Sequence, residues 1–315
     1  MTRRDFLSGG GMAVGGLVAT SALPVFAEDD PSLFQRRGRF ERLAIVYQRI
    51  EIGATKPFSV LHISDTHLTA AYPSEGEWAQ KRSRIRSRTF GGRQEEALRD
   101  SLAWAKEHVD YVLHTGDMID FQSEANFDLV RKYYGEGGAT MFGALGNHEF
   151  YHGQSRKEEK DAFKGESLPL LGRAYPFDLS LASTVVNGVN FVTLDNAYET
   201  VTANQATRFE AEIKKGLPIV LCMHCPIGTQ KLMQAWHKFW RTDNPKAIAD
   251  ASKWTWKSGD KTTCDFVAYL KAQPLLKAIL AGHAHITASD RFSPTAMEYL
   301  VGGNFLFAGQ EIIFE

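Results

Sequence analysis

The sequence has few cysteines, no excess of charge of either sign and few long apolar runs. Its 36 basic and 37 acidic residues nearly cancel, so the chain has no overall field that would attract nucleic acid or an anionic membrane, and we expect no nucleic-acid partner. Beyond residue 27 it contains no internal repeat, low-complexity tract or second long apolar segment. With 43% hydrophobic residues in a chain of 315, a large core is possible, and a single domain over residues 28–315 is the simplest interpretation.

One mildly apolar run does occur, at the beginning of the chain, in TRRDFLSGGGMAVGGLVATSALPVFA. Arg3 and Arg4 precede it and small residues close it, a pattern that resembles a twin-arginine export signal with cleavage after Ala27. The alternative is an uncleaved anchor, but 18 residues with five glycines (Gly9–Phe26) make a poor membrane-spanning helix. We therefore expect residues 1–27 to be a removable signal peptide, no stable membrane span to remain, and the protein to be periplasmic or secreted.

The three cysteines are Cys222, Cys225 and Cys264. In an exported protein this odd number leaves one of them unpaired. Cys222 and Cys225 flank His224, where a thiolate can ligate a metal. Small buried side chains, or a disulfide between Cys225 and Cys264, are the interpretations we favour.

Apolar strand-like runs alternate with amphipathic segments along the rest of the chain, which predicts an α/β fold. Asn187-Gly188 lies between two β-rich runs and predicts a two-residue hairpin. Short antiparallel strands are expected from Thr287 onward. The other expected strands are Phe58–Ile63, Tyr111–His114, Thr140–Leu145, Pro218–Met223 and Leu276–Ala281, and the expected helices lie near Arg93–His108, Glu124–Tyr134, Asn204–Lys215 and Thr263–Ala272.

Polar side chains follow five of these apolar runs. In open α/β sheets, ligands gather beyond the carboxyl ends of the strands, so the five segments should converge on one site. Carboxylates and imidazoles are costly to bury unless something pairs with them, and cations are the partners we expect. The side chains are Asp65, His67, Asp117, Asn147, His148, His224, His283 and His285.

The spacing within these segments supports a shared site. Asp65 and His67 are two residues apart, as are His283 and His285, and residues i and i+2 of an extended strand point the same way. Each pair can therefore face one metal cluster. Glycines precede the polar residues where the chain must turn sharply. They are Gly116, Gly146 and Gly282.

The blocks Asp-x-His, Gly-Asp, Gly-Asn-His-Glu, His and Gly-His-x-His occur in this order between residues 65 and 285. In this the sequence resembles the calcineurin-like metallophosphoesterase family. The resemblance implies a four-layer α-β-β-α sandwich, in which two mixed β-sheets are flanked by helices. It also implies two metal ions with Asp117 as the bridge. One ion would be held by Asp65, His67, Asp117 and His285, and the other by Asp117, Asn147, His224 and His283.

A mixture of imidazole and carboxylate ligands suits Mn, Fe or Zn. Two such ions polarise phosphoryl oxygens and make hydroxide available near neutral pH. The resemblance implies that His148 stabilises the transferring phosphoryl group and protonates the leaving oxygen as a general acid. Asp120 and Glu149 are candidates to orient nearby histidines, whereas His62, His114 and His152 are expected to be structural.

These features predict metal-dependent hydrolysis of phosphoric esters, with phosphodiesters slightly favoured over phosphomonoesters. The substrate would be a small molecule or a lipid headgroup. A catalytically silent metal-binding protein with the same fold is the alternative from another class. The complete ligand set and the presence of His148 argue against that alternative.

Two further segments leave alternatives open. The run KRSRIRSR, residues 81–88, is expected to be a loop after the first site segment. It is either a solvated surface or a basic flap in which Arg84, Arg86 and Arg88 bind substrate anions. The stretch from Trp236 to Trp256 holds four tryptophans and is either a small local core or a cap over an organic group of the ester.

Overall fold

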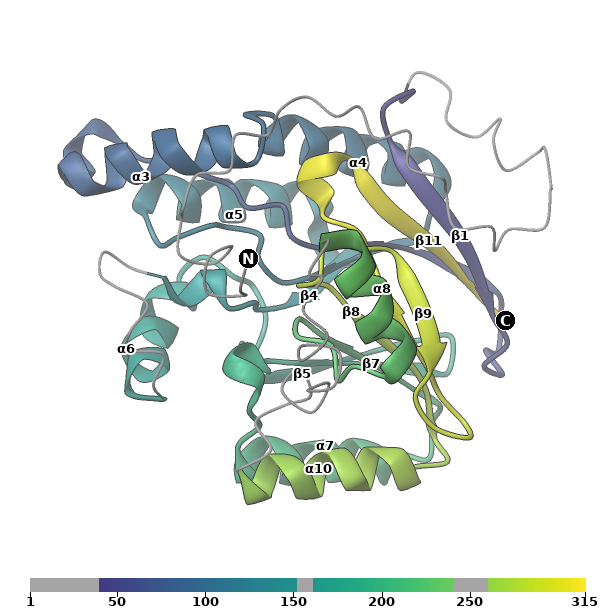
Figure 1. The fold of residues 1–315 in the computed structure, drawn as a ribbon. Helices are drawn as coiled ribbons and strands as arrows, with labels where there is room; N and C mark the ends of the chain where they lie inside the picture. The colour runs from purple at the N-terminus through teal and green to yellow at the C-terminus, as the bar shows by residue number, and fades with distance from the viewer. Residues whose placement is uncertain (1–39, 152–160, 241–259) are drawn as a thin grey trace.

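The strands form two mixed sheets in the computed structural model, which describes residues 40–151, 161–240 and 260–315 (Figure 1). Within the sheets, β2, β3 and β4 run parallel, as do β6, β7 and β8, so the carboxyl ends of each set share one edge. The first sheet has the order β1 (Ala44–Ile50), β11 (Ala308–Phe314), β2 (Phe58–Ile63), β3 (Tyr111–Thr115) and β4 (Met141–Ala144). The second has the order β5 (Leu181–Val186), β6 (Val189–Leu194), β7 (Ile219–Met223), β8 (Leu276–Ala281), β10 (Met297–Leu300) and β9 (Ala288–Arg291).

Helices cover the outer faces of the two sheets. In Figure 1, α3, α4 and α5 lie above the first sheet, and α7 and α10 lie below the second. The α-helices of the described residues are α3 (Gly76–Thr89), α4 (Gln94–His108), α5 (Glu124–Gly137), α6 (Asp161–Leu171), α7 (Ala203–Ile213), α8 (Gln230–Trp240) and α10 (Lys261–Ala272).

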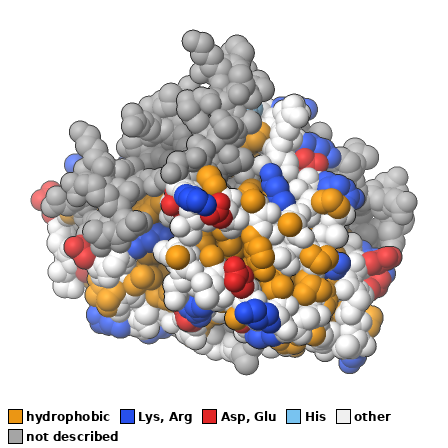
Figure 2. All heavy atoms as spheres, turned by 90° about the horizontal axis from the view of Figure 1, so that it is seen from below, with side chains coloured by type: hydrophobic (Ala, Val, Ile, Leu, Met, Phe, Trp, Pro, Cys, Tyr) orange, Lys and Arg blue, Asp and Glu red, His pale blue; other side chains and the backbone are white. Residues whose placement is uncertain are grey.

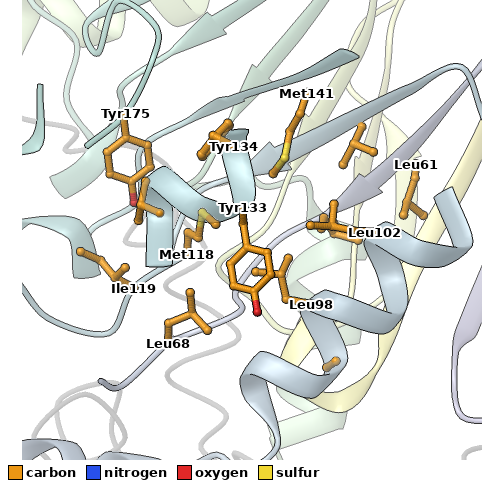
Figure 3. Packing of buried hydrophobic residues seen from close by; sticks show 14 of the residues in the cluster. Leu61, Leu68, Leu98, Leu102, Met118, Ile119, Tyr133, Tyr134, Met141 and Tyr175 are labelled. Atoms are coloured by element: carbon orange, nitrogen blue, oxygen red, sulfur yellow. The ribbon is translucent and has the colours of Figure 1, made fainter. Parts of the chain in front are cut away.

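Three apolar clusters fill the spaces between these four layers. A buried strand such as β2 contributes to two of them, because successive residues of a strand face opposite sides of its sheet. In β2, Leu61 packs toward the helices with Leu98 and Tyr133 (Figure 3). Ile63 of the same strand belongs to this cluster too. Val60 of the same strand belongs to the cluster between the two sheets. The interior therefore requires strands that are apolar on both faces, which is the pattern that predicted them.

The third cluster lies between the second sheet and its helices. Phe209 of α7 meets Phe266 and Tyr269 of α10 edge-to-face, with ring centroids 5.3 and 6.5 Å apart. Figure 2 views the molecule from this side, where hydrophobic side chains are interspersed with charged ones.

The predicted fold class is confirmed, and the bounds of β2 and β8 agree with the expected strands. The hairpin is also confirmed: Asn187 and Gly188 join β5 to β6 with φ of 44° and 82°, the left-handed conformation that such turns need.

One prediction is corrected. Residues 81–88 form part of α3 rather than a loop. Strands do follow Thr287: β9 and β10 pair antiparallel, whereas the last strand, β11, enters the first sheet, parallel to β1 and antiparallel to β2. Of the two interpretations of the cysteines, the disulfide is not formed: all three are thiols, and Cys222 and Cys225 are buried.

The signal segment, His152 and most of the stretch from Trp236 to Trp256 lie outside the described residues. Within the described ranges, Trp236 packs beside a small cluster that includes Leu232 and Leu300. None of the helices there has the length and apolar character needed to cross a membrane.

Candidate metal centre

The five predicted segments converge where the parallel strands of both sheets end. Asp65 and His67 follow β2, Asp117 follows β3, and Asn147 follows β4. His224 follows β7, and His283 and His285 follow β8. The structure thus brings the seven predicted metal ligands to one place.

A first group of possible ligand atoms comprises Asp65, His67 and His285. Nε2 of His285 lies 3.1 Å from Oδ1 of Asp65 and 3.2 Å from Nε2 of His67. Nε2 of His67 lies 3.8 Å from Oδ1 of Asp65. Two ligands bound to one ion at about 2.1 Å are roughly 3–3.5 Å apart, so the two separations from His285 suit a single transition-metal ion.

A second group comprises Asp117, His224 and His283. Nε2 of His224 lies 3.2 Å from Oδ2 of Asp117 and 3.1 Å from Nδ1 of His283. Oδ2 of Asp117 is also 3.8 Å from Nε2 of His67, in the first group. One carboxylate oxygen therefore lies between the two groups, as a bridging ligand would.

Hydrogen bonds select which atoms of these side chains can bind an ion. Oδ1 of Asp117 accepts from the backbone N–H of His148 at 2.8 Å, which leaves Oδ2 toward the histidines. Nδ1 of His224 lies 2.8 Å from the carbonyl of Thr115. Because a carbonyl only accepts, Nδ1 carries the hydrogen and Nε2 is the nitrogen available to a metal.

Asn147 offers the clearest sign that a cation belongs here. Its Nδ2 donates to Tyr151 Oη at 2.9 Å, which fixes the orientation of the amide. Its Oδ1 is buried and has no hydrogen-bond partner among the residues that the structure describes. A buried carbonyl oxygen without a partner is costly, and a bound cation removes that cost. The donor set and this oxygen therefore fit a divalent metal centre.

The backbone at the site departs from the expected extended form. Asp65, His67, Asp117, His283 and His285 all have φ between 53° and 64°, in the left-handed region that non-glycine residues rarely occupy. The extended-strand explanation for the i, i+2 pairs is therefore wrong, and His283 and His285 fall in different groups. Their alignment comes from tight turns at the strand ends.

The three predicted turn glycines show why no side chain fits there, and a Cβ at Gly146 would overlap Asp117. Gly116 has φ of 89°, a conformation that glycine adopts without steric cost. A Cβ at Gly282 would overlap the side chains of Ser64 and Asp65.

Burial and charge act in opposite directions on the ligands. Burial alone raises the pKa of the Asp117 carboxyl, but His224 and His148 beside it hold that pKa well below its usual range. Burial also lowers the pKa of His224, yet Asp117 and then Asp65 raise it to about 10. A cation bound at these atoms would displace the proton of His224, because only the neutral ring ligates.

His148 lies beside this cluster, and each of its ring nitrogens faces a defined neighbour. Its Nδ1 is 3.1 Å from the carbonyl oxygen of Asp120 and 2.9 Å from Oδ1 of the same residue. Both atoms accept, so Nδ1 carries a hydrogen, and Nε2 is the nitrogen left toward Asp117. Nε2 lies 4.0 Å from Oδ2 of Asp117, next to the proposed bridge.

Asp120 therefore lies beside His148, and Oδ1 is also 3.5 Å from Nδ1 of His67. Glu149 has a different place from the one predicted. Its carboxylate accepts the backbone N–H groups of Asp117, Met118 and Gly146 at 2.7–2.9 Å. It thus fixes the backbone of two site loops rather than a histidine. Burial, followed by the charge of Asp117, raises the pKa of Glu149 to about 7.

Sequence reasoning missed two supporting residues. The side chain of Asn196 accepts the backbone N–H of His224 at 3.1 Å and donates to the carbonyl of Cys225 at 2.6 Å. It lies two residues after the apolar run of β6, and a polar residue after such a run is the signal that identified the other site residues. The ring of Phe90 stacks on that of His67, with centroids 4.2 Å apart and planes 8° from parallel. No local pattern indicated that contact.

His62 and His114 lie beneath the site as structural residues. His62 pairs with Thr115 Oγ1 at 2.8 Å and His114 with Thr66 Oγ1 at 2.9 Å. Burial lowers the pKa of His62 to about 3 and that of His114 to about 4. Both are neutral hydrogen-bonding groups near neutral pH.

The arginines of the basic run, residues 81–88, lie in different environments. Arg84 and Arg88 are exposed on α3, and their role in binding substrate stays a prediction. Arg86 is 4% exposed and makes two hydrogen bonds to Asp120. Arg82 also approaches Asp120, at 3.5 Å.

The sequence profile of the calcineurin-like phosphoesterase family matches residues 58–287, most of the chain. The chain belongs to this family, and with its candidate metal ligands it is a phosphoric ester hydrolase. No curated protein sequence matches the chain.

Several solved structures are similar. A dimetal phosphatase from Danio rerio is 15% identical, with 81% of this chain and 91% of that chain covered and a TM-score of 0.45. A purple acid phosphatase from yellow lupin (Lupinus luteus) seeds is 12% identical, with 79% and 44% covered and a TM-score of 0.47. A 5'-nucleotidase from Candida albicans is 11% identical, with 83% and 47% covered and a TM-score of 0.39.

Proposed function

We propose that the protein hydrolyses phosphodiesters at a two-metal centre bridged by Asp117. The observation that carries this proposal is the position of Asp117 Oδ2, 3.2 Å from His224 in one group and 3.8 Å from His67 in the other. The proposed ligands are Asp65, His67, Asp117 and His285 for one ion, and Asp117, Asn147, His224 and His283 for the other. Mn, Fe and Zn suit this donor set.

When bound, two such ions polarise the phosphoryl oxygens and make hydroxide available near neutral pH. The residues of the chain supply the remaining parts of the reaction. His148 Nε2 faces the cluster beside Asp117, so it is placed to protonate the leaving oxygen as the P–O bond breaks. Its Nδ1 stays protonated against the two oxygens of Asp120, which keeps Nε2 as the exchanging nitrogen.

The arginines near His148 favour a diester over a monoester. Two hydrogen bonds commit Arg86 to Asp120, and Arg82 is drawn to the same carboxylate. A phosphodiester carries one negative charge and a phosphomonoester up to two. Because these guanidinium groups are paired with a carboxylate, less positive charge is left to bind a second negative charge. The site therefore suits the less charged ester. A small molecule and a lipid headgroup both remain within this substrate class.

A matched panel of bis- and mono-nitrophenyl phosphates, assayed with added Mn, Zn or Fe, tests the proposal. We expect metal-dependent turnover that is faster with the diester. Faster turnover of the monoester would show that the protein prefers phosphomonoesters. No turnover of either ester, with two ions shown to be bound, would establish the silent metal-binding alternative.

We also propose that the protein works outside the cytoplasm, in the periplasm or as a secreted protein. Arg3, Arg4 and the small residues before Glu28 support this proposal. Twin-arginine export carries folded proteins, so the metal centre would be assembled before export.

A further inference from the structure

Helix α3 reaches the candidate site from outside the five motif segments. Its last turn and the residue after it place Arg86 and Phe90 on one face of the helix, four residues apart. The guanidinium of Arg86 lies over the ring of Phe90, with Cζ 4.7 Å from the centroid. Phe90 in turn stacks on His67.

The contact between Arg86 and Asp120 is a buried, two-point ion pair. Nε of Arg86 donates to Oδ2 at 2.8 Å and Nη2 donates to Oδ1 at 2.7 Å. Arg86 is 4% exposed and Asp120 is fully buried. Two parallel hydrogen bonds fix the plane of a carboxylate, which a single bond does not.

The same carboxylate touches His148. Oδ1 of Asp120, held by Nη2 of Arg86, is 2.9 Å from Nδ1 of His148. The orientation of the imidazole is therefore set by an oxygen whose own position is set by Arg86.

We propose that Arg86 is a positioning residue for His148, acting through Asp120. This inference rests on the proposed function, because it assigns His148 the transfer of a proton to the leaving group. The guanidinium of Arg86 is buried against Asp120, so we assign it this role in place of the sequence-based prediction that it binds substrate anions. A phosphoryl group meets His148 in a fixed orientation because Arg86 prevents the Asp120 carboxylate from rotating.

The test compares Arg86→Met with Arg93→Met. Arg93 is a matched control because it holds Glu96 through the same nitrogens, with Nε at 2.7 Å, and its Cζ lies 4.8 Å over the ring of Phe307. That pair is partly exposed and contacts none of the proposed ligands. We expect Arg86→Met to lower kcat for alkyl esters by about 10–100-fold, the usual effect of losing a residue that orients a side chain of the site. KM and metal content should change little, nitrophenyl esters should lose less, and Arg93→Met should behave as the original protein.

A double-mutant cycle with Asp120→Asn tests the route of the effect. Arg86→Met leaves a buried carboxylate without its partner and can destabilise the fold, whereas the double variant removes both charges and should fold better. If Arg86 acts through Asp120, adding Arg86→Met to Asp120→Asn should cause little further loss of kcat. The imidazole N–H resonance of His148, assigned by its absence in His148→Ala, should shift or broaden in Arg86→Met.

Three outcomes would overturn the inference. A higher KM with unchanged kcat would make Arg86 a substrate contact. Loss of metal in Arg86→Met would mean that it acts on His67. Additive losses in the cycle would exclude Asp120 as the intermediary. Failure of the proposed function is a separate result, since the unmodified protein would then hydrolyse no ester with both ions bound.

Discussion

Oδ2 of Asp117 lies 3.2 Å from Nε2 of His224, although the two residues follow strands of different sheets. The other nitrogen of His224 also faces the first sheet, at the carbonyl of Thr115. The candidate metal centre therefore joins the two sheets at the edge where their parallel strands end. Substitutions at this contact should affect both metal binding and the packing of the two sheets against each other.

Replacing Asp117 with Ala should remove the proposed bridge. We expect the loss of one or both ions and of turnover of every ester, because polarisation and hydroxide formation are lost together. Metal analysis of the purified variant, alongside rates, measures this. Asp265→Ala, on the exposed surface of α10, is the control. Retention of both ions would show that Asp117 does not bridge them.

Replacing His148 with Ala should separate proton transfer from metal binding. Both ions should remain, and alkyl esters should lose about 10²–10⁴-fold in rate, the usual range for a general acid. Nitrophenyl esters should lose less, because nitrophenolate leaves without a proton. Equal losses for both leaving groups would restrict His148 to stabilising the phosphoryl charge, and loss of metal would make it a ligand.

The buried carboxyl of Glu298 should make the stability of the folded protein depend on pH. Glu298 is fully buried in β10 and accepts the backbone N–H of Ile227 at 2.7 Å. Burial raises its pKa from 4.5 to about 7. The folded protein then binds a proton that the unfolded chain has released, so the free energy of unfolding should fall as pH rises from about 4.5 to 7, by about 3 kcal/mol.

Glu298→Gln should remove this contribution while its amide oxygen still accepts from Ile227. Urea unfolding at pH 5 and pH 8 measures the difference, with the exposed Glu77→Gln as the control. We expect the Gln variant to gain stability relative to the original protein at pH 8 but not at pH 5. The same pH dependence in both proteins would rule out Glu298 as its source.

Neutralising Arg84 and Arg88 by substitution with Gln tests the remaining part of the basic run. We expect KM for an anionic ester to rise at low ionic strength and its salt dependence to flatten, because salt screens attraction between exposed charges. Arg208→Gln on α7 is the control. An unchanged KM at low ionic strength would make this face of α3 a solvated surface.

The export proposal depends on the paired arginines. A variant with Lys at positions 3 and 4 should accumulate in the cytoplasm and lose the periplasmic or secreted fraction. Cell fractionation with immunodetection measures this, and the folded cytoplasmic protein should still bind metal. Normal export of the double variant would contradict the proposal.

The sequence predicted best those elements whose burial is visible locally. The residues of β2 and β8 are apolar on both faces, so the run itself marks the strand, and the polar residue after it marks the site. Helix α3 was missed because its charged run lacks an apolar stripe. The structure places Arg86 of this helix in a buried ion pair with Asp120, and that partner lies 34 residues away.

Pairing over long distances in the chain explains the other differences. β1 and β11 lie at opposite ends of the described chain and pair in parallel, which neither segment indicates alone. The left-handed conformations at the site are also absent from any periodic pattern. They follow from the tight turns at the strand ends.

Those left-handed conformations imply a conflict between folding and catalysis at the same residues. A non-glycine residue in this region costs of order 1–3 kcal/mol, and five of the proposed ligands share the conformation. Glycine at these positions would relieve the backbone but remove the donor atoms. Asp and His are among the residues that tolerate the conformation best, so the side chains that hold metal are also those that this backbone can accept. The protein thus keeps an active site whose turns work against its own stability, and ion binding, which favours the folded state, offsets that cost.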